Sequence, residues 1–359
     1  MISVSLICAD YNDRKNIQIL EEKADFIHFD LMNLDFSSCT AFDVQDIKRL
    51  KLNPNKIDVH ISALYPDVYV DKCIDCECAM ICFPVESKTN IAKNLEKIRK
   101  NDIKAGLSVK PDTKIEVLEP FLPLVDYVNV LTIFPGPPGQ DFQVAELNKI
   151  ISLRKLREKL GLNYLIEVDG SVNESHFYDI SKCKPDILVV GTSGLFALNE
   201  DLTKAWAKMN EYMNKKETVF LHADLVGSTL LEPVINYVTD LGYSIVNLYS
   251  NGIDEYPECA RKLCTHVLSD KYNIGILLCG TGIGMSIAAN KIDGIRAAVV
   301  SDPFSARAAK EHNNANVLCL GSRVVTSYLA KQIVEEFLNS SFLHGKHQPR
   351  VERIDSSKY

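Results

Sequence analysis

Histidine and carboxylate residues stand at three points of the sequence where short apolar runs end. The segments span residues 28–32 (HFDLM), 58–60 (DVH) and 167–170 (EVDG). Residues two apart on a strand point to the same side, so His28 and Asp30 would share a face. Two imidazoles and two carboxylates form a suitable ligand set for one divalent ion of the Zn, Fe, Mn or Co group. The alternative is that each residue is an ordinary solvated group at a strand end.

Two carboxylates on opposite sides of a metal ion suit one class of reaction. One carboxylate removes a proton from the carbon next to a carbonyl group, and the ion stabilises the negative charge that develops. The other carboxylate returns a proton to the opposite face of the same carbon. Because the carbon is inverted, the ligand set predicts an epimerase.

Three glycine-containing segments fit a phosphate group. They span residues 136–140, 170–171 and 191–194, and each follows an apolar run. In barrels, the loops after the last strands commonly bind phosphate through backbone N–H groups. The residues that we assign to this role are Gly136, Gly139, Gly170, Ser171, Gly191, Thr192 and Ser193.

A cysteine stands at the head of another glycine-containing loop, residues 279–284 (CGTGIG). The spacing G-x-G-x-G differs from the G-x-G-x-x-G of dinucleotide-binding folds, which argues against a nucleotide. A helix N-terminus after the loop would favour a thiolate. Such a thiolate could take a proton next to a carbonyl group while N–H groups hold the enediolate oxygen. The alternative for Cys279 is a buried structural thiol.

Polar and basic residues later in the chain could contact a phosphate group, and the arginines among them could bind it bidentately. They end a predicted helix, follow a predicted strand or lie near the C-terminus. The alternative for the C-terminal group is a solvated basic end. The residues are His312, Asn313, Arg323, Lys346, His347 and Arg350.

The elements that must position these residues follow from the apolar pattern. From residue 1 to about 213, short apolar runs alternate with amphipathic segments such as 88–100 and 144–160. This alternation predicts βαβ units and a parallel sheet. Eight units predict an N-terminal α/β domain, a (β/α)8 TIM barrel over residues 1–213, with its site at the carboxyl ends of the strands. The predicted strands are Ser3–Cys8, Phe26–Asp30, Lys56–Ile61, Ala79–Phe83, Lys104–Val109, Tyr127–Leu131, Tyr164–Asp169 and Ile187–Val190.

A second domain is predicted over residues 218–359, after a polar linker at 214–217. Five apolar runs alternate there with helical patterns, which predicts an open α/β sandwich with a five-stranded parallel sheet. Residues 340–359 are predicted to form a polar tail. The predicted strands are Val219–His222, Ser244–Leu248, Ile274–Cys279, Ile295–Val299 and Asn316–Leu320.

The composition and charge of the chain argue against two classes of binding partner, nucleic acid and membrane. The 359 residues carry 40 basic and 47 acidic side chains, a net charge of −7, and 46% of them are hydrophobic. A chain with this balance lacks the basic field that non-specific nucleic-acid binding needs. The sequence shows no signal-peptide pattern and no stretch near the ~20 apolar residues of a membrane span. We therefore expect neither nucleic acid nor membrane as a partner.

Eleven cysteines, an odd and scattered set, fit free thiols in a reducing cytoplasm. Four of them fall within residues 73–82, where a zinc site is the alternative to small core residues. Structural zinc sites usually have two pairs of ligands separated by a longer loop, so core residues are favoured. The four are Cys73, Cys76, Cys78 and Cys82.

The segments HxDxM, DVH, FPGxxGQ, VDG and VGTSGLF resemble the ribulose-phosphate 3-epimerase family over about residues 2–213. Residues 166–171 and 190–196 are most similar to its D-allulose-6-phosphate 3-epimerase branch. The resemblance implies Asp30 and Asp169 as the acid/base pair and Ser5 as a substrate contact. The metal ligands that it implies are His28, Asp30, His60 and Asp169.

The sequence departs from this family at three positions. Asn33 stands where aspartate is usual after HxDxM. Ser62 and Leu131 stand where the family has methionines that are thought to cover the reaction intermediate. These departures bear on the range of substrates, while the implied metal ligands and acid/base pair are complete.

The segments CGTGIGMSIAANK, GIRAA, HNNANVL, LGSRVV and GKHQPRV resemble type B ribose-5-phosphate isomerases and galactose-6-phosphate isomerase subunits over about residues 217–355. The resemblance implies Cys279 as the base that moves a proton between C1 and C2, with no metal. It implies that Thr281 and the N–H groups of Gly280, Gly282 and Gly284 hold the enediolate. His312 would open the sugar ring. The implied binding residues are Asp224, Asn313, Arg323, Lys346 and Arg350.

Members of this second family are homodimers with sites built across the interface, so at least a dimer is implied through the C-terminal domain. Leu225 replaces the histidine of the family's D-H-x-G segment, and Lys346 stands where arginine is common.

Together the two halves predict a bifunctional enzyme acting on sugar phosphates. The product of the isomerase would be the substrate of the epimerase. Ribose 5-phosphate could pass through ribulose 5-phosphate, or allose 6-phosphate through allulose 6-phosphate. The alternative is a sugar-phosphate sensor or scaffold that has lost catalysis, motivated by the substituted positions Asn33, Ser62, Leu131, Leu225 and Lys346.

Overall fold

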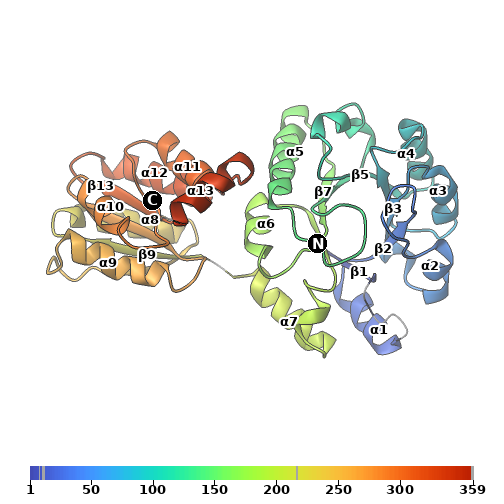
Figure 1. Ribbon diagram of the computed structural model, residues 1–359, viewed down its shortest axis with the longest axis horizontal. Helices are drawn as coiled ribbons and strands as arrows, with labels where there is room; N and C mark the ends of the chain where they lie inside the picture. Colours follow the sequence, from blue (N-terminus) through green and yellow to red (C-terminus); the bar gives the residue numbers. More distant parts are fainter. Residues whose placement is uncertain (8, 10–12, 216, 357–359) are drawn as a thin grey trace. The chain divides into compact units, whose positions relative to one another are not determined.

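The computed structural model describes residues 1–7, 9, 13–215 and 217–356. The chain divides into two compact units, Met1–Asn214 and Lys215–Tyr359. Figure 1 shows the first in blue to green and the second in yellow to red. Cys8 of the first predicted strand and residue 216 of the predicted linker lie outside the described residues. No described helix is long and apolar enough to cross a membrane.

The first unit is a closed barrel of eight parallel strands that follow one another in chain order. This confirms the predicted barrel. Most strand residues are buried on both faces, as in parallel sheets covered by helices. The strands are β1 (Ile2–Ser5), β2 (Phe26–Met32), β3 (Ile57–Ser62), β4 (Met80–Pro84), β5 (Lys104–Val109), β6 (Tyr127–Leu131), β7 (Leu165–Asp169) and β8 (Ile187–Val190).

Helices lie outside the ring of strands (Figure 1). One connection differs from the regular pattern: β5 and β6 are joined by 3-10 turns at Ile115–Leu118 and Leu122–Leu124. Pro120 and Pro123 lie in this segment, and proline disrupts a helix because it lacks an N–H donor. The helices are α1 (Arg14–Lys23), α2 (Val44–Leu50), α3 (Asp67–Ile74), α4 (Ile91–Arg99), α5 (Leu147–Leu160), α6 (Phe177–Cys183) and α7 (Leu202–Met213).

Strand register places the polar residues of the barrel interior side by side. In the β2–β3 pair, His28 is opposite Asp58 and Asp30 is opposite His60. In the β6–β7 pair, Asp169 is opposite Leu131. These residues lie at or near the carboxyl ends of their strands, which is where barrel enzymes carry their chemistry.

The second unit has one parallel five-stranded sheet in the order β10-β9-β11-β13-β12, which confirms the predicted open sandwich. The chain runs from β9 outward to β10 and then returns to β11 on the other side of β9. Ligands commonly bind at such a switch in direction, beside the carboxyl ends of the strands. The strands are β9 (Thr218–Ala223), β10 (Ser244–Asn247), β11 (Ile274–Cys279), β12 (Ala297–Val299) and β13 (Val317–Gly321).

The end of the chain differs from the predicted polar tail, because a helix spans Gln348–Asp355. Pro349 lies in the first turn of this helix, where a missing N–H is tolerated. Buried His347 and Val351 and an ion pair from Arg296 to Asp355 (2.8 Å) hold it against the unit. The helices of the unit are α8 (Leu231–Asp240), α9 (Tyr256–Val267), α10 (Ile283–Ala289), α11 (Pro303–Asn313), α12 (Ser327–Asn339) and α13 (Gln348–Asp355).

Candidate active sites

A pocket opens at the carboxyl ends of the barrel strands, bounded by strand ends and by the loops after β6, β7 and β8. His28 is fully buried and contacts the pocket residues Asp30 and Asp169. The structure therefore brings together all residues predicted for the first site. Those that line the pocket are Ser5, Asp30, His60, Gly136, Gly139, Asp169, Gly170, Ser171, Gly191, Thr192 and Ser193.

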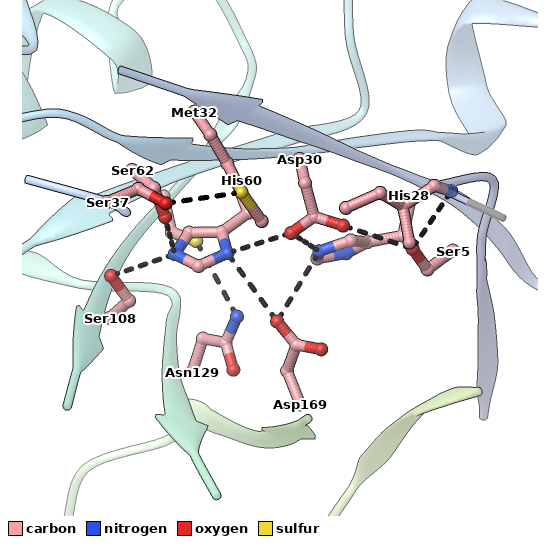
Figure 2. Close-up of polar contacts among 12 residues, drawn as sticks. Ser5, His28, Asp30, Met32, Ser37, His60, Ser62, Ser108, Asn129 and Asp169 are labelled. Carbon is pink, nitrogen blue, oxygen red and sulfur yellow. Dashed lines mark hydrogen bonds and ion pairs between the residues drawn. The ribbon is translucent and has the colours of Figure 1, made fainter. Parts of the chain in front are cut away.

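Four donor groups converge in this pocket (Figure 2). Nε2 of His28 lies 3.4 Å from Oδ1 of Asp30 and 3.6 Å from Oδ2 of Asp169. Nδ1 of His60 lies 3.3 Å and 3.5 Å from the same two oxygens. Metal–ligand bonds of about 2.0–2.2 Å place tetrahedral ligands about 3.3–3.6 Å apart. The residues present therefore fit a zinc-like metal ion.

The charges of the cluster also favour a cation. Burial alone would lower the pKa of His28, but the carboxylates of Asp58 and Asp30 outweigh it and raise this pKa well above its usual range. Burial also opposes protonation of His60, yet hydrogen bonds with Asp169 and Asp30 raise its pKa to about 9. Burial alone would raise the pKa of Asp30, but the two imidazoles lower it. Carboxylates that hold protons on both rings would equally attract a divalent ion.

Serine hydroxyl groups contact Asp30 and His60 of the cluster (Figure 2). Oγ of Ser5 donates a hydrogen bond to Oδ2 of Asp30 over 3.0 Å. Nε2 of His60 lies 3.2 Å from Oγ of Ser108 and 3.3 Å from Oγ of Ser62. His60 therefore turns Nδ1, rather than Nε2, toward the two aspartates.

The three residues that differ from the epimerase family lie in different parts of the first unit. Ser62 and Leu131 both line the pocket, so they shape its walls. The amide of Asn33 donates to the hydroxyl of Tyr69 over 2.7 Å, and its oxygen accepts from the backbone N–H of Asp35. Asn33 thus joins the segment after β2 to helix α3 and is not part of the pocket lining.

Two buried carboxyl groups were missed by the sequence reasoning. Oδ2 of Asp58 lies 2.7 Å from Nδ1 of His28. Glu167 is fully buried, which raises the pKa of its carboxyl group well above the usual range. With His28 they form a second close group of potential ligands. Each stands two residues before a predicted ligand, so the period-2 alternation of strands could have identified both.

The loops predicted to hold phosphate are connected to one another. Oγ of Ser171 donates to the carbonyl oxygen of Gln140 over 2.6 Å, which joins the loops after β7 and β6. Gly170 has φ +114°, a backbone conformation that residues with a side chain rarely adopt. The hydroxyl proton of Ser171 is therefore engaged within the protein.

The second site lies at the carboxyl end of β11. The backbone N–H of Gly282 donates to Sγ of Cys279 over 3.1 Å, and Cys279 is buried. A Cβ atom on Gly227 would approach the carbonyl oxygen of Leu278 to 2.1 Å, so only glycine lets the loop after β9 lie this close. The N–H of Asp224 in that loop donates to the same carbonyl oxygen.

Arg323 joins this group, because its backbone N–H donates to the carbonyl oxygen of Gly280 over 3.0 Å. Thr281 lies against Gly321 at the end of β13. Leu225, which replaces the family's histidine, is 66% exposed. The structure therefore brings together Asp224, Cys279, Gly280, Thr281, Gly282, Gly284 and Arg323.

His312 and the other polar residues predicted for this site lie elsewhere in the unit. His312 lies in the last turn of α11, which runs from the carboxyl end of β12 back to the start of β13. Its ring stacks on His347, with centroids 4.5 Å apart. Burial lowers the pKa of His347, and His312, Lys346 and Arg350 lower it further. Asn313 follows His312 in the same helix.

The second unit thus has two groups of predicted site residues, which lie at opposite ends of the parallel strands of its sheet. Cys279 lies where β11 ends, whereas His312 lies where β13 begins, and the two strands are parallel. The structure does not bring them together within one chain.

The cysteines of the run 73–82 do not form a close ligand group. Within the described residues, the two close groups of potential ligands are those of the barrel interior, and neither contains a thiol. Cys73, Cys78 and Cys82 are buried in the barrel unit, and Cys76 is half-buried. Their arrangement is that of core residues.

Comparison with known proteins gives one family match within each of the two compact units. The model of the ribulose-phosphate 3 epimerase family matches residues 1–196. The chain is 31% identical over 211 residues to the ribulose-phosphate 3-epimerase of Buchnera aphidicola, covering 56% of this chain and 92% of the relative.

The ribose/galactose isomerase family matches residues 219–354. The ribose-5-phosphate isomerase B of Escherichia coli is 42% identical over 133 residues, covering 36% of this chain and 89% of the relative. Among solved structures, the ribose 5-phosphate isomerase of Thermotoga maritima is 42% identical with a TM-score of 0.37, covering 39% of this chain and 97% of that chain.

Proposed function

The chain belongs to the ribulose-phosphate 3-epimerase family through its first unit and to the ribose/galactose isomerase family through its second, and on this premise we propose its two reactions. It is an isomerase, and both families act on sugar phosphates. We propose that the first unit inverts C3 of a ketose phosphate in a metal-dependent reaction. The second unit interconverts that ketose phosphate with an aldose phosphate without a metal, and the chain works in the cytoplasm.

The four-donor cluster of the barrel pocket carries the epimerase proposal. Asp30 and Asp169 come from β2 and β7, and both line the pocket. One of them removes the C3 proton of the bound ketose phosphate, and the other delivers a proton to the opposite face. A divalent ion held by His28, Asp30, His60 and Asp169 would withdraw negative charge from the substrate oxygens. The loops after β6, β7 and β8 would bind the phosphate group.

For the isomerase, the support is the position of Cys279 at the switch between β9 and β11. Its thiolate takes a proton from C2 of the open-chain aldose phosphate and returns it to C1. The N–H groups of the loop from Gly280 to Gly284 and the Thr281 hydroxyl hold the enediolate oxygens. Asp224 and Arg323 lie beside this loop and would bind the rest of the substrate.

We further propose that two copies of the chain complete each isomerase site. A second copy can supply the polar residues that lie at the end of the sheet opposite to Cys279. These residues are His312, Asn313, Lys346 and Arg350. Exposed apolar side chains belong to the loops and helices that follow the carboxyl ends of the strands, where Cys279 lies, and they could pack against a second copy. They are Leu225, Ile253, Tyr256, Ile283, Ile287, Phe304 and Val324.

Allulose 6-phosphate and ribulose 5-phosphate are the two candidate substrates shared by the units. The residues 166–171 and 190–196 favour the hexulose phosphate. We expect the purified full chain to turn over allulose 6-phosphate with a kcat/KM at least about tenfold above that for ribulose 5-phosphate, a discrimination within reach of pocket contacts. Coupled assays of both reactions measure this. The reverse preference would assign the pentose route, and no turnover of either would indicate a sugar-phosphate-binding protein without catalysis.

Metal removal is expected to separate the two activities. A chelator should abolish epimerisation, because the carboxylates and imidazoles of the barrel then lose the ion that stabilises the developing charge. Isomerisation should continue at its full rate, since Cys279 needs no metal. Re-addition of Zn²⁺, Mn²⁺ or Co²⁺ to the treated protein should restore epimerisation and identify the effective ion. Equal inhibition of both activities would contradict a metal-free second site.

A further inference from the structure

The two histidines of the barrel cluster present different ring nitrogens to the aspartates. His28 turns Nε2 toward Asp30 and Asp169, and His60 turns Nδ1 toward them (Figure 2). Nε2 of His28 makes no hydrogen bond in the described part of the chain, although it is fully buried. A buried nitrogen without a partner is costly unless a ligand engages it.

The opposite nitrogen of His28 has one well-placed partner. Nδ1 lies 2.7 Å from Oδ2 of Asp58, and both side chains are fully buried. Ser3 donates a second hydrogen bond to this same oxygen over 2.8 Å. Asp58 lies opposite His28 in the β2–β3 register, so the sheet itself fixes the pair.

We propose that Asp58 is the positioning residue that fixes His28 for metal binding. An ionised carboxylate can only accept hydrogen bonds, so it keeps the proton of the neutral ring on Nδ1. The lone pair is then on Nε2, the nitrogen that faces Asp30 and Asp169. This inference rests on the metal-dependent epimerase proposed above.

The partners of His60 differ in kind from Asp58, the partner of His28, and this difference decides which ring nitrogen carries the proton. Nε2 of His60 contacts the hydroxyl groups of Ser62 and Ser108. A hydroxyl can donate or accept, so it does not by itself choose which nitrogen carries the proton. A carboxylate does, and the one beside His28 is held in place by Ser3.

Glu167 offers a matched comparison in the same buried space. Its Oε1 lies 3.9 Å from Nδ1 of His28, which is too far for a hydrogen bond. Both carboxyl groups are nearest to Nδ1 of His28, so Glu167→Gln and Asp58→Asn each replace a carboxyl group with an amide beside the same ring nitrogen. Only the second removes the acceptor that fixes the ring.

We expect Asp58→Asn to bind Co²⁺ about 10–100-fold more weakly than the unaltered full chain, the usual effect of losing such a partner. An asparagine can donate its amide N–H to Nδ1, which moves the ring proton to Nε2 and blocks coordination there. Titration of the metal-stripped protein, followed by the visible Co²⁺ spectrum and by calorimetry, measures the affinity. Glu167→Gln is expected to bind Co²⁺ within about threefold of the unaltered protein, because no ring hydrogen bond is lost.

A purely structural role of Asp58 would give a different result. It would lower the unfolding temperature of the metal-free protein and leave the Co²⁺ affinity unchanged, which would overturn the proposal. An unaltered chain that binds no stoichiometric Co²⁺ would instead overturn the metal-dependent epimerase itself. The two failures are therefore distinguishable.

A measurement on the unaltered sequence covers the case in which Asp58→Asn does not fold. Histidine labelled with ¹⁵N in the Zn²⁺-loaded protein reports which ring nitrogen carries hydrogen, and a His28→Gln variant assigns the signal. We expect the His28 proton on Nδ1, protected from exchange with water. A proton on Nε2 would contradict the role of Asp58.

Discussion

Replacing Asp169 with asparagine is expected to lower kcat for C3 epimerisation by about 10²–10⁴-fold, the usual contribution of a positioned acid or base. The substitution keeps the size of the side chain and removes its ability to accept and release a proton. Among the described residues, Asp30 and Asp169 are the only carboxyl groups that line the pocket, so no third one there could replace Asp169. Isomerisation by the second unit should keep its full rate, and coupled assays of both reactions on one preparation compare the two.

Metal content has to be measured beside this rate, because Asp169 is also a proposed ligand. A variant that retains the ion but not the activity assigns proton transfer to Asp169. Glu167→Gln is the matched control, since it makes the same change two residues earlier on the same face of β7. Equal loss of epimerisation in both variants would contradict the assigned role of Asp169, and loss of both activities in Asp169→Asn would contradict two separate sites.

Cys279→Ala is expected to have the complementary effect, a loss of isomerisation by about 10²–10⁴-fold with unchanged epimerisation. The thiol accepts a hydrogen bond from the N–H of Gly282 and stands at the edge of the sheet where Asp224 and Arg323 converge. Alanine leaves the loop in place and removes the proposed base. Buried Cys319, on the adjacent strand β13, supplies the control, and Cys319→Ala should keep the isomerase rate.

A mixing experiment tests the shared site at the same time. Cys279→Ala and His312→Ala should each be inactive as isomerases, because each lacks one half of every site. Random pairing of the two should restore about one quarter of the original activity, since half the dimers are mixed and each mixed dimer has one intact site. Full activity of Cys279→Ala would remove Cys279 from its role, and no recovery on mixing would contradict a site shared between copies.

The barrel and the open sandwich could be predicted because the physical signals were strong. Eight buried parallel strands appear as short apolar runs with helices between them, and their polar residues fall at the strand ends. The 3-10 turns between β5 and β6 were not predicted, although Pro120 and Pro123 mark that segment. The helix at Gln348–Asp355 was missed because few of its residues are apolar, and its stability comes from contacts such as that of Arg296 with Asp355.

The ligand set of the barrel could be predicted residue by residue, but not its supporting contacts. Which nitrogen of His28 faces the aspartates depends on the β2–β3 register, which places Asp58 beside its ring. The separation of His312 from Cys279 depends on the direction of α11 relative to a parallel sheet, which is a property of topology. Neither relation is visible in local sequence patterns.

The stacking of His347 on His312 makes residues 346–355 part of the proposed isomerase site rather than an appendage. Deleting residues 346–355 would therefore remove Lys346 and Arg350, two residues proposed to bind the substrate of the second unit. A polar, basic segment that resembles expendable sequence can therefore tolerate less change than its composition suggests.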